Sequence, residues 1–169
     1  ILALLAGSFV MAAAHIYNSW ADYFLTKLDQ GTASERSLPK PYTSGQQLIA
    51  EGRIGAQGLV IAMGAYVMAA VFSAALMIER GGSIYSIGLV LLAFLCAPWY
   101  SWAKLHYHPE IPLGLGFAVV GVWLGMAAGG QIDWGRGVLL SIHFFIMWGF
   151  LAEHIDQRFD WEPNYPKGA

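Results

Sequence analysis

Two clusters of carboxylates stand out in a chain that otherwise has few charges, and the first lies in segment 18–29. On a helix, steps of four and seven residues place Asn18, Asp22 and Asp29 within about 20–40° of one another. An amide and two carboxylates would then share one stripe at the end of a helix. We expect this stripe to face a cavity, because the opposite side carries bulky apolar residues, namely Trp20, Phe24, Leu25 and Leu28.

The second cluster, in segment 153–160, places Glu153, Asp156 and Asp160 on one side of a helix in the same way. Carboxylates crowded together repel one another and take up protons unless a cation neutralises them. Magnesium suits such oxygen ligands and typically adds phosphate and water to one or two carboxylates. Basic residues are interleaved with both clusters: Arg36, Lys40, Arg53, Lys104 and Lys167. The pattern predicts a magnesium and diphosphate site, and an acid-lined cation path is the alternative.

The elements that must position these residues are membrane-spanning helices. Of the 169 residues, 57% are hydrophobic and only 12% are charged, about half the usual share of a soluble domain. Five uncharged runs approach or exceed the roughly 20 residues that a helix needs to cross a bilayer. They are 1–21, 54–78, 81–103, 111–132 and 137–152. We therefore expect an all-α, polytopic bundle of about five transmembrane helices.

Net charge and cysteine content exclude further classes of protein. A net charge of −2 gives no attraction to phosphate backbones, so we expect no nucleic-acid partner. The single cysteine, Cys96, lies in an apolar run and has no second thiol in the chain to pair with. Because it lies in an apolar run, we expect Cys96 to be a packing residue. The partner expected for the apolar runs is the lipid bilayer.

The placement of charge along the chain predicts an orientation. If successive helices alternate in direction, segments 18–53, 103–111 and 153–169 share one end of the bundle, named here the A face. Tight glycine-rich turns would then lie at the other end, the B face. Seven of the nine basic residues fall on the A face, which the positive-inside rule makes cytoplasmic. Nine of the eleven acidic residues fall there too, and this rule does not account for them. We expect a multi-pass protein of the cytoplasmic (inner) membrane whose site faces the cytoplasm.

The order of these residues resembles the UbiA-type intramembrane prenyltransferases. The first motif of that family reads roughly NDxxDxxxD, and one branch, the dihydroxynaphthoate type, has Asp-Tyr followed by Gly-x-Asp. Asn18, Asp22, Tyr23 and Asp29 match this order, as does the basic and prolyl stretch 36–45.

Three later segments resemble the same family. Segment 100–107 is similar to its Tyr-Ser…Lys-Leu-Lys-Tyr loop, with His106 in place of a lysine, and segment 114–117 is similar to the glycines of its next helix. The second acidic motif is matched by Glu153, Asp156, Asp160 and Lys167. The family has nine helices, and the chain corresponds to helices two to six. We expect residues 1–169 to form a single membrane domain that is a piece of such a protein.

The resemblance implies a magnesium-dependent enzyme that moves a prenyl group from an isoprenoid diphosphate to an aromatic acceptor. It implies a catalytic group of Asn18, Asp22, Asp29, Asp156 and Asp160. The implied metal ligands are Asp22, Asp29, Glu153, Asp156 and Asp160. The implied substrate contacts are Lys40, Arg53, Tyr100, Lys104 and Lys167. The Asp-Tyr order favours a naphthoate of menaquinone-like quinone synthesis, and hydroxybenzoate, chlorophyllide, haem and glycerol-phosphate acceptors are alternatives.

Other functions fit the residues less well. A cation-coupled transporter with a carboxylate-lined path needs acids or broken helices near mid-membrane, whereas these acids gather at one end. The five histidines do not form the dense cytoplasmic group that a membrane di-iron oxygenase needs, and we expect His143 to be a hydrogen-bonded core residue. A soluble terpenoid synthase would have amphipathic helices. A non-catalytic scaffold leaves both acidic clusters unexplained.

Overall fold

The computed structural model describes residues 1–27, 49, 52–106 and 108–152, and it has no strand among them. The chain forms α-helices, three of which continue into π-helical turns labelled η. In chain order the elements are α1 (Leu2–Trp20), η1 (Ala21–Leu25), α3 (Ala56–Glu79), α4 (Tyr85–His106), α5 (Glu110–Ala118), η2 (Val119–Trp123), α6 (Leu124–Ala128), α7 (Trp134–Phe144) and η3 (Phe145–Ala152).

These elements make five spans that are long and apolar enough to cross a membrane. The spans are Leu2–Leu25, Ala56–Glu79, Tyr85–His106, Glu110–Ala128 and Trp134–Leu151. Within lipid each backbone N–H and C=O needs a partner inside the chain, and a helix supplies it from its own backbone. The prediction of an all-α, multi-pass protein with five membrane-spanning helices is confirmed at this level.

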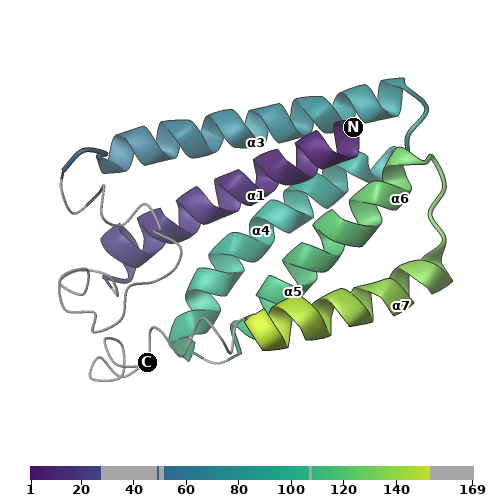
Figure 1. Cartoon of the computed structure of the whole chain (residues 1–169). Coiled ribbons are helices and arrows are strands. Elements are labelled where there is room, and N and C mark those ends of the chain that lie inside the picture. Colours follow the sequence, from purple (N-terminus) through teal and green to yellow (C-terminus); the bar gives the residue numbers. More distant parts are fainter. Residues whose placement is uncertain (28–48, 50–51, 107, 153–169) are drawn as a thin grey trace.

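Spans that follow one another in the chain run in opposite directions across the molecule, whereas α1 and α4, which lie side by side, run in the same direction. Figure 1 shows them in the order α3, α1, α4, α5–α6 and α7. The end of α1, the start of α3 and the end of α4 lie together at one end of the bundle, which is the A face. The alternation expected from the sequence therefore brings segments far apart in the chain to one end of the bundle.

Small residues fill the contact between the helices. Ala6 and Val10 of α1 are buried in one cluster with Ala70 and Ala74 of α3 and Val90 of α4. Lipid tails are as apolar as these side chains, so close packing rather than the exclusion of water holds such helices together. The close approach of α1 to α3 and α4 fixes where the end of α1 lies relative to the end of α4.

The two turns at the B face have the expected glycines. Gly81 and Gly130 have φ angles of 88° and 79°, a region that glycine enters without steric cost. The turns also meet, because the N–H of Ser83 donates to the carbonyl of Ala127 at 2.7 Å. This contact ties the start of α4 to the end of α6.

The last span packs on its neighbour through glycine. A Cβ atom at Gly149 would lie 2.8 Å from the carbonyl oxygen of Glu110, and one at Gly114 would lie 2.7 Å from the ring of Phe145. Trp123 adds a polar contact by donating its indole N–H to the hydroxyl of Ser141 at 2.8 Å. The η3 turn therefore lies against the start of α5, close to the A face.

The substitution Gly149→Ala is expected to lower the free energy of unfolding by about 1–3 kcal/mol, because the added methyl group meets backbone rather than a flexible side chain. Gly64→Ala in α3 is the control, since no atom lies within 4 Å of a Cβ atom there. Alanine at that position should leave stability unchanged or raise it. Thermal unfolding of the purified protein in detergent measures both, and equal melting temperatures for the two variants would contradict the packing.

His143 departs from its expected environment. It is exposed, stacks edge-on to Phe144 with ring centroids 6.4 Å apart, and makes no hydrogen bond to a residue that the structure describes. The side of the last span that packs against the preceding span contains Gly137, Ser141 and Phe145. Position 143 lies on the other side of the helix. The prediction of a hydrogen-bonded core histidine is therefore wrong.

Candidate functional site

The first span ends in a widened turn that carries Asp22. The N–H of Thr26 donates to the carbonyl of Ala21 at 2.8 Å, which is the i→i−5 bond of a π-helix. The hydroxyl of Thr26 also donates to the carbonyls of Ala21 and Asp22, at 3.3 and 3.4 Å. Lys27 has a φ angle of 59°, so the helix cannot continue beyond it. Single π-helical turns of this kind occur frequently at functional sites.

The carboxylate of Asp22 forms an ion pair with Lys104 of α4. Lys104 Nζ lies 2.8 Å from Asp22 Oδ2, although the two residues are 82 positions apart in the chain. Asp22 is 3% exposed, so its charge is almost completely removed from solvent. A buried charge costs several kcal/mol of lost hydration unless a partner offsets it. The ammonium group of Lys104 is that partner.

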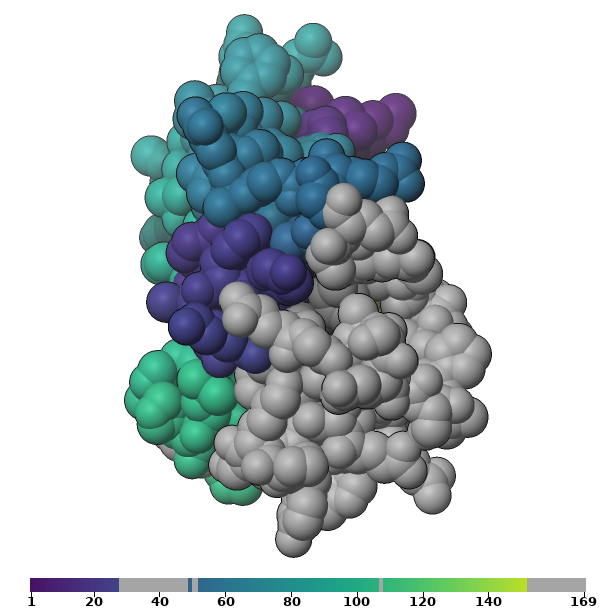
Figure 2. All heavy atoms as spheres, turned by 90° about the vertical axis from the view of Figure 1, so that its left-hand side faces the viewer, coloured from purple at the N-terminus to yellow at the C-terminus, as the bar shows by residue number. Residues whose placement is uncertain are grey.

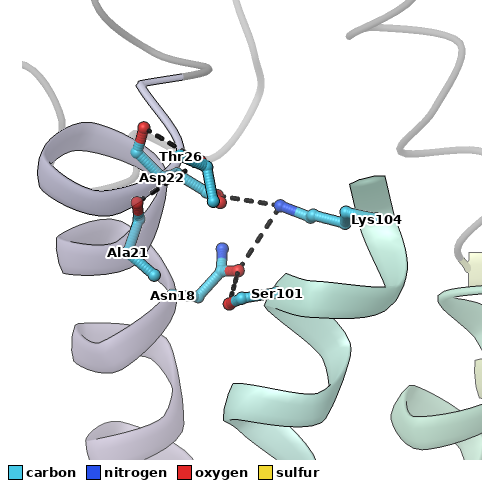
Figure 3. Close-up of polar contacts among 6 residues, drawn as sticks. All are labelled: Asn18, Ala21, Asp22, Thr26, Ser101 and Lys104. Carbon is cyan, nitrogen blue, oxygen red and sulfur yellow. Dashed lines mark hydrogen bonds and ion pairs between the residues drawn. The ribbon is translucent and has the colours of Figure 1, made fainter. Parts of the chain in front are cut away.

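Asn18 and Tyr100 also contact the ammonium group of Lys104. Asn18 Oδ1 lies 3.4 Å from Lys104 Nζ and 3.4 Å from the hydroxyl oxygen of Ser101. The ring of Tyr100 has its centroid 4.9 Å from Lys104 Nζ, which is a cation–π distance. Figure 3 shows how the side chains of α1 and η1 meet those of α4. The site thus joins two spans within about two turns of their ends.

The second carboxylate oxygen of Asp22 has no hydrogen-bond partner among the residues that the structure describes. Oδ1 is buried and accepts no hydrogen bond from any residue in the described part of the chain. Buried polar atoms in proteins are nearly always satisfied, so an unsatisfied one needs an explanation, such as a ligand or ion that occupies it. A hard anionic oxygen beside a lysine is suited to a cation or to a hydrogen-bond donor of a ligand.

Four of the predicted site residues lie together, and a fifth lies at the same end of the bundle. Asn18, Asp22, Tyr100 and Lys104 form the cluster described above. Arg53 lies exposed in the turn before α3. Figure 2 views this end of the molecule and shows the blue-purple end of the first span beside the start of α3. The remaining predicted residues lie outside the described residues: Asp29, Lys40, Glu153, Asp156, Asp160 and Lys167.

One part of the sequence interpretation is corrected by the end of the first span. The common stripe of Asn18, Asp22 and Asp29 assumed an unbroken α-helix. The helical span ends at Leu25, and Lys27 has a positive φ, so the helix is not unbroken past Asp22; Asp29 lies outside the described residues. Beside Asp22, Lys104 of α4 lies against one oxygen of the carboxylate.

Comparisons of the chain with protein-family models, curated proteins and solved structures found no match. The residues themselves therefore carry the functional argument. Within the ranges that the structure covers, no three Asp, Glu, His or Cys side chains lie close enough to hold a metal on their own. A metal at this end would need ligands beyond Asp22, from a substrate, from solvent or from the acidic residues outside those ranges.

Two contacts were missed by sequence reasoning. Ser101 is 2% exposed and bonds across to Asn18, and Thr26 closes the π-helical turn. The spacing of Ser101 and Lys104, three residues apart, already placed both on one side of a helix. His106 stands where the family that the sequence resembles has lysine. Its Nδ1 donates a hydrogen bond to the backbone carbonyl of Trp102 at 2.8 Å, and its ring stacks on the indole of Trp102.

Proposed function

We propose that the chain belongs to an intramembrane prenyltransferase of the UbiA type, with the partial UbiA-like fold that five of nine helices would form. In this proposal it moves a prenyl group from an isoprenoid diphosphate to an aromatic acceptor, with magnesium, in menaquinone-like quinone biosynthesis. The observation that carries the proposal is the buried pair of Asp22 and Lys104 with its unpaired carboxylate oxygen. Both residues stand in segments that resemble the family.

The depth of the pair fits an amphipathic substrate. Asp22 and Lys104 lie three and two residues from the ends of their spans, Leu25 and His106. A prenyl diphosphate in a bilayer keeps its charged head at the interface and its hydrocarbon tail among the lipids. A site within about one turn of the span ends meets the head group without drawing it into the membrane core.

Asp22 Oδ1 fits magnesium as a ligand, because it is a hard anionic oxygen that no donor occupies. Asp29, Glu153, Asp156 and Asp160 complete the proposed ligand set and lie outside the described residues. Bound magnesium would stabilise the negative charge that grows on the diphosphate as the allylic C–O bond breaks.

The basic and aromatic side chains act on the same leaving group. Lys104 supplies a positive charge that Asp22 holds in place before substrate arrives, so little reorganisation is needed. Tyr100 packs against that ammonium group and would line the substrate beside it. Lys40, Arg53 and Lys167 are the further proposed phosphate contacts. The surrounding apolar helices exclude water, which would otherwise capture an allylic carbocation.

The proposed location is the cytoplasmic membrane, with the site on the cytoplasmic side. Seven of the nine basic residues belong to segments assigned to the A face, where the Asp22 pair lies. A cation-coupled transporter is supported less. The acids that the structure describes, Asp22, Glu79, Glu110 and Asp133, lie at or within one turn of a span end rather than at mid-membrane.

The proposed function is tested by incubating membranes that contain the protein with a labelled prenyl diphosphate and a panel of acceptors. The expected result is a prenylated aromatic product that forms when magnesium is present and does not form when EDTA chelates the magnesium. The panel should include a dihydroxynaphthoate, a hydroxybenzoate, a chlorophyllide, haem and a glycerol phosphate. Absence of a prenylated product with every acceptor, at saturating magnesium, would refute the transferase.

A further inference from the structure

Asn18 has only one side-chain atom that accepts hydrogen bonds, and that atom faces two donors. Ser101 Oγ and Lys104 Nζ each lie 3.4 Å from Asn18 Oδ1. An ammonium group only donates, so the carboxamide must present its oxygen rather than its NH₂ group to Lys104. Both contacts are long for hydrogen bonds, and each is therefore weak. What the pair of contacts determines is the orientation of the amide.

Ser101 is unusual among the buried serines in where its hydroxyl is bonded. Serine in a helix commonly donates to the carbonyl four residues before it, as Ser73 does to Ala69 at 2.8 Å. Ser101 is also buried, yet its hydroxyl donates across from α4 to Asn18 of α1. Its hydroxyl stands one turn before Lys104 on the same helix. It therefore holds the acceptor that Lys104 also uses.

We infer that Ser101 and Asn18 are positioning residues that orient the Lys104 ammonium group toward the anionic head of the substrate. Asn18 thus acts through Lys104 and contacts neither the metal nor the reacting atoms. The inference rests on the proposed function, because it assigns a role within that site. It adds Ser101, which lies in a segment that resembles the family but to which the resemblance gave no role, and it gives Asn18 a task distinct from that of the aspartates.

The first test is the Ser101→Ala variant, with Ser73→Ala as the matched control. Ser101→Ala should raise KM for the prenyl diphosphate roughly three- to tenfold, the size expected when one weak hydrogen bond is lost. The half-saturating concentration of magnesium should stay the same, since the serine acts on lysine and not on the metal ligands. Ser73→Ala removes an equally buried hydroxyl whose bond stays within one helix, so KM should not change.

A role through Lys104 makes the effects non-additive. In a Lys104→Met background, adding Ser101→Ala or Asn18→Ala should change KM no further, because the group they orient is gone. If the role of Ser101 were merely structural, Ser101→Ala would raise KM in both backgrounds. Thermal unfolding of each variant shows whether it is folded. If Ser101→Ala does not fold, Asn18→Ala takes its place as the test variant.

The outcomes separate this inference from the proposed function. Wild-type protein without magnesium-dependent turnover of a prenyl diphosphate would refute both. Wild-type turnover with an unchanged KM in Ser101→Ala, or with a shifted magnesium requirement, would refute the positioning role alone. An effect of Ser101→Ala that persists in the Lys104→Met background would also refute it.

Discussion

Replacing Asp22 with asparagine is expected to reduce prenyl transfer roughly 100- to 1,000-fold, the scale seen when one preorganised electrostatic group is removed. Asparagine has nearly the same shape, its Oδ1 can still accept from Lys104, and the Lys104 side chain is 18% exposed, so the packing of η1 against α4 should persist. It removes the negative charge that pairs with Lys104 and the anionic Oδ1 proposed to bind magnesium. The loss should therefore appear in turnover rather than in the amount of folded protein.

Asp133→Asn is the matched control for this prediction. Asp133 caps α7 at the opposite end of the bundle, where its carboxylate accepts the N–H of Arg136 at 3.0 Å. Asparagine caps helices about as well as aspartate, so neither stability nor turnover should change. Steady-state rates at saturating magnesium measure both variants. Wild-type turnover by Asp22→Asn would remove Asp22 from the catalytic group.

The substitution Lys104→Met is expected to lower the free energy of unfolding by about 3–5 kcal/mol, because it leaves the buried Asp22 carboxylate without its ion-pair partner. The double variant Asp22→Asn with Lys104→Met should recover most of this loss, since no unpaired charge remains buried. Its turnover should nevertheless stay roughly 100- to 1,000-fold below that of the wild-type protein. Chemical unfolding of the purified protein in detergent measures the stabilities.

The exposed pair of Asp133 and Arg136 provides the comparison for that loss. Their side chains are 59% and 75% exposed, and Arg136 Nε lies 4.0 Å from Asp133 Oδ2. Exposed ion pairs of this kind contribute about 0–1 kcal/mol, so Arg136→Met should cost little. If Lys104→Met cost no more than Arg136→Met, the Asp22–Lys104 pair would not be the buried ion pair described here.

The number of spans and their alternating direction were predictable from the sequence because lipid imposes a simple rule. Uncharged runs of sufficient length must be helical. Each span that crosses the membrane must then run in the opposite direction to the span before it in the chain. This reasoning placed Asp22 and Lys104 at the same end of the bundle. It did not show that they pair, because the contact depends on how α1 rotates against α4, and small residues such as Ala6 and Val10 determine that rotation.

Details of the local backbone were beyond the sequence pattern. The change of pitch at η1 could not be read from the spacing of the residues, so the stripe of Asn18 and Asp22 was drawn on an unbroken α-helix that in fact ends at Leu25. The role of Ser101 was hidden for a similar reason, because a serine in a helix commonly bonds its own backbone. His143 shows the reverse error, since aromatic neighbours in sequence did not bury it.

The central claim is that the Asp22–Lys104 pair lies in the site that binds the diphosphate head of a prenyl substrate with magnesium. Equilibrium binding of a radiolabelled prenyl diphosphate to the wild-type protein and to Asp22→Asn, each with magnesium and with EDTA, tests it most directly. Saturable binding that needs both magnesium and Asp22 is the predicted result. Binding of equal affinity in all four samples, or no binding by the wild-type protein, would contradict the claim.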